Sequence, residues 1–236
     1  MNYVLVLIIK LIAAIMISVI MGNGAVVAFN HIPVKWFVEE GKDLEPSLLD
    51  ASRQRITSTP WKWIFVTLFS VVSIYLILTM SIIYTIGTSI VLWLILLATI
   101  SDIKYGIIPD QFTILIAVSA IGFIILHEKW TDQLYGALIG FVILIAVYGV
   151  GRLVYRKDAV GGGDIKMFAS LGLVLGVGGI VMVFIMSTFL SAAHFVYLLA
   201  TKSAKPGETR PMMPYIFMSY TIYIVFLWDF GIEIVI

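Results

Sequence analysis

The chain contains no cysteine and carries little charge for its 236 residues. Lys, Arg, Asp and Glu make up 12% of it, whereas a soluble domain carries roughly 25%. The absence of cysteine excludes disulfides, thiolate metal sites and a cysteine nucleophile. A net charge of +1 gives no general electrostatic attraction for nucleic acid, so no nucleic-acid partner is expected. The composition excludes both a water-soluble globule and a disordered chain.

Long hydrophobic runs dominate what is present. Hydrophobic residues are 61% of the chain and the mean hydropathy is +1.07. Since a membrane helix needs about 20 mostly apolar residues, the sequence predicts an all-α, polytopic transmembrane helical bundle of about eight spans. We expect these spans at residues 3–22, 62–80, 83–101, 111–127, 134–155, 165–179, 180–200 and 212–232. The sixth and seventh are divided at Gly176-Val177-Gly178-Gly179, because one helix over 165–200 is too long for a single crossing.

One polar stretch interrupts the bundle. Residues 23–61 mix acidic and basic residues with three prolines, and they are too few to build a core of their own. The sequence therefore predicts three parts: a first transmembrane span at 1–22, a cytoplasmic loop or cap at 23–61, and a transmembrane bundle at 62–236.

The distribution of Lys and Arg predicts the orientation. If loop 23–61 is inside, thirteen of the fifteen cations lie inside as well, as expected of cytoplasmic loops. Both termini then lie outside. We expect a multi-pass protein of the inner (cytoplasmic) membrane, with the lipid bilayer as its surroundings.

Two acidic elements lie at the same predicted membrane face. The third span ends in Ser101-Asp102, and the sixth begins after Gly161-Gly162-Gly163-Asp164. Two spans separate Asp102 from Asp164, and an even number of crossings returns the chain to the same side. Both carboxyl groups are therefore expected at helix ends on one face, which the charge distribution identifies as cytoplasmic.

Paired carboxyl groups in a site of low dielectric constant do not both ionise readily. The charged member can take a proton from water while the protonated member polarises an amide carbonyl, which is aspartic-protease chemistry. Gly161 and Gly163 allow unusual backbone geometry and the close approach of a substrate strand. The alternative is a flexible turn with Asp164 as a helix N-cap, and a solvated pair of Asp102 with Lys104. The occurrence of both acids on one face favours the catalytic interpretation.

These residues also carry a family resemblance. The stretch from Asp102 to Asp110 resembles the Asp-x(6)-Pro-Asp/Asn element of type IV prepilin leader peptidases. Gly161-Gly162-Gly163-Asp164-Ile165-Lys166 resembles their Gly-x-Gly-Asp-x-Lys element. Residues 24–33 are loosely similar to the stretch after the family's first helix, and Pro211-Met212-Met213-Pro214 to the segment before its last one. The resemblance covers nearly the whole chain in order.

The resemblance implies a membrane aspartyl endopeptidase of the GxGD type, with Asp102 and Asp164 as the catalytic pair. Its substrates would be prepilins or pseudopilins of type IV pili or type II secretion, cut after the Gly that ends a short basic leader. Proteolysis would need no cofactor and no metal. Many members also methylate the new N-terminus with S-adenosylmethionine, and many carry two Cys pairs of a zinc pattern in the cytoplasmic loop. This chain lacks those cysteines, so a metal is not implied and methylation stays open.

Three further polar residues adjoin the predicted site. Asp110 follows Pro109, and a helix N-cap is its favoured interpretation, although it is also the best substitute if Asp102 is not catalytic. Lys104 and Lys166 each follow a proposed catalytic Asp by two residues. They either hold a carboxylate ionised or sit among lipid phosphates.

The residues alone also allow three other functions. A protease of the presenilin or signal-peptide-peptidase kind would have Tyr before the first Asp and a Pro-Ala-Leu motif, whereas Ser101 stands here. A proton-coupled transporter would use Asp102 and Asp164 as a proton relay, but it predicts midplane carboxylates and repeated halves. A non-catalytic subunit of a secretion machine would use both acids structurally.

Overall fold

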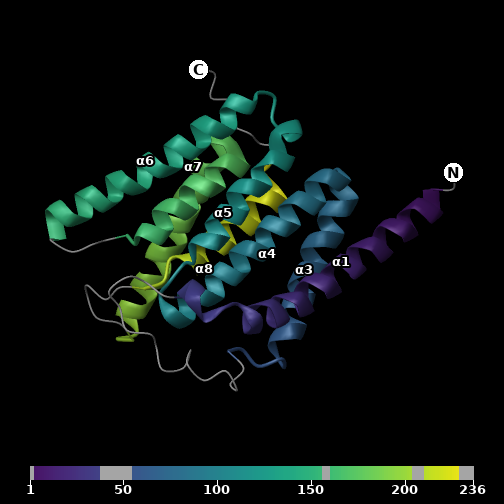
Figure 1. Cartoon of the computed structure of the whole chain (residues 1–236), viewed down its shortest axis with the longest axis horizontal. Coiled ribbons are helices and arrows are strands. Elements are labelled where there is room, and N and C mark those ends of the chain that lie inside the picture. Colours follow the sequence, from purple (N-terminus) through teal and green to yellow (C-terminus); the bar gives the residue numbers. More distant parts are fainter. Residues whose placement is uncertain (1–2, 38–54, 156–159, 204–209, 229–236) are drawn as a thin grey trace. The chain divides into compact units, whose positions relative to one another are not determined.

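The computed structural model describes residues 3–37, 55–155, 160–203 and 210–228 (Figure 1). All regular secondary structure in these ranges is helical, which confirms the all-α class. The chain forms two compact units, residues 1–97 and 98–236, and each is described by itself. The predicted division of the chain at residues 22 and 61 stays a prediction.

The first unit is built on one long N-terminal helix. Its elements are α1 (Tyr3–His31), η1 (Val34–Phe37), α3 (Trp61–Thr79) and the larger part of α4 (Ile82–Tyr105), which continues into the second unit. Helix α1 runs on to His31, well beyond the predicted end of the first span at residue 22. It packs closely against α3, since a Cβ on Gly22 would lie 2.5 Å from the backbone nitrogen of Val66.

Side chains at the end of α1 anchor the chain where it returns toward α3. The Asn30 amide donates to the Ile56 carbonyl and accepts the Ile56 N–H, both at 3.0 Å. The Arg55 guanidinium donates to the Phe29 carbonyl at 3.1 Å and lies 5.0 Å from the centre of the Phe37 ring. Most of the predicted cap, residues 38–54, lies outside the described residues.

The second unit consists of the end of α4 and the helices that follow. These are α5 (Asp110–Ser119) continuing as η2 (Ala120–Leu126), α6 (Trp130–Tyr155), α7 (Gly162–Ala200), and α8 (Met213–Ile222) continuing as the π-helical η3 (Tyr223–Leu227). Helices α6 and α7 run side by side (Figure 1). Glycines allow this approach, because a Cβ on Gly136 would contact the Gly172 carbonyl oxygen and lie 2.6 Å from the Gly176 carbonyl carbon.

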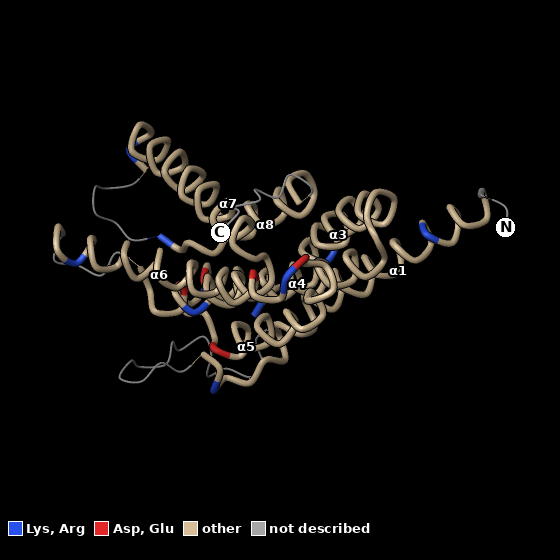
Figure 2. The backbone as a smooth tube through the Cα atoms, turned by 90° about the horizontal axis from the view of Figure 1, so that it is seen from above, with Lys and Arg blue, Asp and Glu red and all other residues tan. Residues whose placement is uncertain are grey.

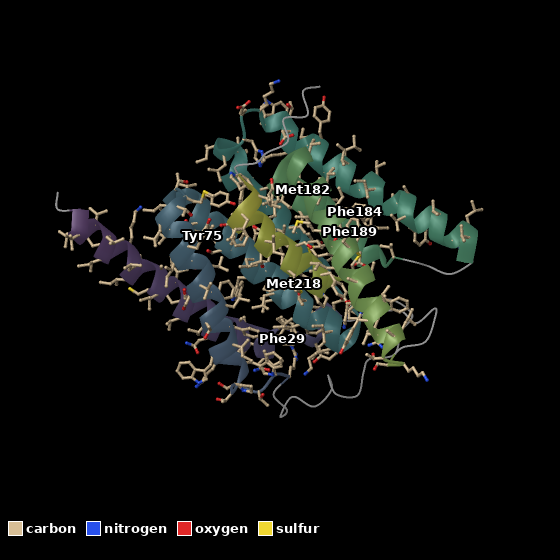
Figure 3. All side chains as sticks on the ribbon, turned by 180° about the vertical axis from the view of Figure 1, so that it is seen from behind. Phe29, Tyr75, Met182, Phe184, Phe189 and Met218 are labelled. Atoms are coloured by element: carbon tan, nitrogen blue, oxygen red, sulfur yellow. The ribbon has the colours of Figure 1, made fainter. Side chains whose placement is uncertain are left out.

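Helix α7 is two helical arms joined at Gly176, rather than one straight rod. Gly176 has φ 68° and ψ −174°, a left-handed backbone region that favours glycine. The rings of Phe168 and Phe184, the latter labelled in Figure 3, lie 6.0 Å apart. Sixteen residues of straight helix would separate them by about 24 Å, so the arms run antiparallel. The predicted break between the sixth and seventh segments therefore exists, at Gly176.

The connection between η2 and α6, together with the first turn of α6, holds this reversal. His127 Nε2 lies 3.0 Å from the Val174 carbonyl oxygen, and its Nδ1 lies 3.2 Å from the Asp132 carboxylate. The Val177 N–H donates to the same carboxylate at 3.3 Å. A Cβ on Gly176 would overlap Asp132, so both space and backbone angle require glycine there.

The helices have the surfaces of membrane spans. Within the described residues, α1, α3, α4, α6 and α7 are long and apolar enough to cross a bilayer, and residues 110–126 and 213–227 form shorter apolar helices. The tubes of α6 and α7 in Figure 2 show no charged residue over most of their length. Large apolar side chains face outward, such as Phe189 at 72% and Met218 at 49% exposure, both labelled in Figure 3. A multi-pass membrane protein follows, while the count of eight crossings stays a prediction.

Candidate active site

Asp102 lies in the last turn of α4, at a buried helix end. Helix α4 stops at Tyr105, and Gly106 takes the left-handed conformation (φ 64°) that commonly ends a helix. The Gly106 N–H donates to the Asp102 carbonyl at 2.9 Å, and the Ser101 hydroxyl donates to the Ile107 carbonyl at 2.6 Å. These bonds turn the chain back toward α5. Asp102 itself is only 9% exposed.

The N-terminus of α8 meets this aspartate. The Met213 N–H donates to Oδ2 of Asp102 at 3.0 Å, and the Thr99 hydroxyl lies 3.4 Å from the Met213 carbonyl oxygen. Thr99 and Asp102 are three residues apart and so share one face of α4. The first N–H groups of a helix have no partner within it, which suits them to a carboxylate.

Asp164 lies in the first turn of α7, directly after the glycine run. Its Oδ2 accepts the Gly161 N–H at 3.2 Å, while its Oδ1 is buried without a hydrogen-bond partner. A Cβ on Gly163 would lie 3.0 Å from the Ile108 side chain, so glycine lets the α4–α5 connection approach α7 closely. The carboxyl groups of Asp102 and Asp164 lie close enough to interact electrostatically. Two acids 62 positions apart in the sequence thus lie near each other at one end of the second unit.

Asp110 and Lys166 form an ion pair beside these acids. The Lys166 ammonium lies 2.8 Å from each carboxylate oxygen of Asp110, and the two side chains are 55% and 56% exposed. Asp110 is the first residue of α5, Pro109 is the N-cap, and no side chain caps the helix. The interpretation of Asp110 as the N-cap is therefore wrong by one residue. Lys166 does hold a carboxylate, but it is that of Asp110.

The other predicted polar residue, Lys104, lies in the last turn of α4. Lys104 is exposed, with its ammonium 6.0 Å from the centre of the Tyr105 ring. Within the described ranges, no three His, Asp or Glu side chains gather in a way that could hold a metal ion.

Sequence reasoning missed three contacts of the second unit. The Met213 N–H was not assigned to Asp102, although the Pro211–Pro214 segment was recognised as similar to one in the family. The pairing of Asp110 with Lys166 was missed because their spacing of 56 positions carries no periodic signal. The His127–Asp132 contact lies in a connection of ordinary composition.

The fold and the site define a multi-pass helical membrane protein with two aspartates near each other, one at the end of α4 and one at the start of α7. Residues 89–196, which contain both aspartates, match the model described as the Type IV leader peptidase family. This part of the chain is therefore similar to that family, and the match confirms the resemblance and supports prepilin peptidase activity in general. Comparison with curated proteins and comparison with solved structures gave no match.

Proposed function

We propose that the protein is a membrane aspartyl endopeptidase that removes the short basic leader from type IV prepilins or pseudopilins. The observation that carries the proposal is the proximity of Asp102 and Asp164, with the buried Oδ1 of Asp164 left without a partner. A buried polar oxygen in a folded protein normally has a partner, and an unpaired one calls for an explanation. A water molecule or a substrate amide would supply the missing hydrogen bond.

The two carboxyl groups divide the work of hydrolysis. One enters ionised and takes a proton from the attacking water, whose oxygen bonds to the scissile carbonyl carbon. The other enters protonated and donates its proton to the carbonyl oxygen. When the tetrahedral intermediate collapses, the carbon–nitrogen bond breaks and the leaving nitrogen takes up the proton first removed from water. One hydroxyl of the intermediate returns its proton to the second carboxylate as the new carbonyl group forms. Each carboxyl group returns to its starting state, and proteolysis needs no cofactor.

The location of the site suits a substrate that is itself a membrane helix. Asp102 lies at the last turn of α4 and Asp164 at the first turn of α7, both of which are long apolar helices. A prepilin's apolar segment would lie along the bundle, with its leader extending beyond the helix ends. From the Lys and Arg distribution, we infer that this end faces the cytoplasm at the inner membrane.

Incubation of the purified full chain with a synthetic prepilin, followed by mass spectrometry, tests the proposal. We expect loss of the leader with wild-type protein, and no loss with Asp102→Ala or Asp164→Ala, although both variants still insert into the membrane. Parallel reactions with S-adenosylmethionine report separately whether the new N-terminus is methylated. Retained cleavage in either variant would remove that residue from the catalytic pair. The transporter alternative instead predicts proton flux in proteoliposomes without cleavage, and no observation in the described part of the chain favours it.

A further inference from the structure

The backbone of Met213 contacts α4 through both its N–H group and its carbonyl oxygen. Its N–H donates to Asp102 Oδ2 at 3.0 Å, and its carbonyl oxygen lies 3.4 Å from the Thr99 hydroxyl. Met213 is fully buried, and Thr99 and Asp102 are 6% and 9% exposed. Water therefore has little access to replace the N–H that Asp102 accepts.

The sequence around Met213 leaves its N–H available for this contact. The N–H groups of Tyr215 and Ile216 both donate to the Met212 carbonyl, at 3.1 and 3.3 Å. Pro214 has no N–H to donate. Among the first four residues of α8, Met213 thus has the one N–H that donates to a side chain. The N–H of Met212, which precedes the helix, faces the same carboxyl group of Asp102.

We propose that Met213 is a positioning residue for Asp102, acting through its backbone N–H. A carboxyl group rotates easily about its terminal bond, and a donor fixed on one oxygen stops that rotation. With Oδ2 held by Met213, Oδ1 of Asp102 is directed to the reacting water. This inference rests on the proposed function, because it assigns a partner to one of the proposed catalytic residues.

The donor to Asp102 is the backbone N–H of Met213, so the side chain can be changed without removing the hydrogen bond. Replacement of Met213 by the α-hydroxy analogue of leucine, through nonsense suppression in the full chain, turns the amide into an ester and removes the N–H. Met213→Leu keeps the N–H and a similar apolar volume, and is the matched control. The same ester at Ile216 removes an N–H bond of α8 that does not reach Asp102, and controls for helix stability.

We expect the ester at 213 to lower the kcat of prepilin cleavage about 10- to 100-fold, as loss of a hydrogen bond to a charged group implies, with KM unchanged. Met213→Leu and the ester at 216 should keep the wild-type kcat. Wild-type kcat in the ester at 213, or an equal loss in the ester at 216, would overturn the inference. If the leucine-derived ester at 213 does not accumulate, the α-hydroxy analogue of methionine is used at 213 instead, which also removes the N–H and keeps the native side chain. Cleavage by Asp102→Ala would instead overturn the proposed function.

Discussion

Gly136→Ala tests the close packing of α6 on α7 that places Asp164. The new Cβ would meet the Gly172 carbonyl oxygen and lie 2.6 and 2.8 Å from the carbonyl carbon and Cα of Gly176. All of these are backbone atoms, so no side chain can rotate away to make room. Gly149→Ala in the same helix is the matched control, because no atom lies within 4 Å of a Cβ there.

The difference between the two variants isolates the cost of overpacking. Both replacements gain helix propensity, worth up to about 1 kcal/mol, and this gain cancels in the comparison. Overpacking costs about 1–3 kcal/mol, and three backbone atoms within 2.8 Å place Gly136→Ala near the upper value. For a chain of this length, about 3 kcal/mol lowers the Tm by about 6–12 °C.

Thermal unfolding of the purified variants in detergent micelles, followed by circular dichroism, measures this difference. We expect Gly149→Ala to unfold at or slightly above the wild-type temperature and Gly136→Ala well below it. Prepilin cleavage should fall with Gly136→Ala as well, because the displaced arm of α7 carries Asp164. Equal Tm values for the two alanine variants would refute the packing that we describe.

Three further outcomes follow from side-chain contacts. Asp110→Lys should reduce cleavage by placing two ammonium groups together, and adding Lys166→Asp should restore it; no rescue in the double variant would show that the ion pair does not matter. His127→Ala should lower the free energy of unfolding by about 1–3 kcal/mol in thermal denaturation, since it removes two contacts at the α7 reversal; an unchanged Tm would contradict this role. Asn30→Ala should speed limited proteolysis after α1, because both hydrogen bonds to Ile56 are lost; a wild-type digestion rate would show that Asn30 does not anchor the segment.

Helix positions were largely predictable because bilayer thickness limits how long an apolar run can be. The break in the stretch 165–200 followed from that limit, and Gly176 supplies the backbone angle that the reversal needs. The end of α1 was not predictable in the same way. Residues 23–31 continue the helix to a point where Asn30 meets Ile56, a contact between distant parts of the sequence.

The placement of the two aspartates at one end of the second unit followed from counting crossings between Asp102 and Asp164. The hydrogen-bond partners of each aspartate were not predictable, because they depend on which helices pack against one another. No spacing in the sequence specifies that packing. The Met213 N–H reaches Asp102 from 111 positions away. The error on Asp110 has a local cause: the helix begins one residue earlier than an N-cap interpretation allows, so its carboxylate is left for Lys166.

Prepilin cleavage by Asp102→Asn, Asp164→Asn and Asp110→Asn tests whether Asp102 and Asp164 are the catalytic pair. Asparagine keeps the size of the side chain but cannot exchange a proton at the reacting bond. We predict that Asp102→Asn and Asp164→Asn each lower the cleavage rate by about 10²–10⁴-fold, the usual contribution of general acid–base catalysis. Asp110→Asn, which loses only an exposed ion pair, should lower the rate by about fivefold at most. Cleavage by Asp102→Asn or Asp164→Asn at the rate of Asp110→Asn would show that the replaced aspartate is not catalytic.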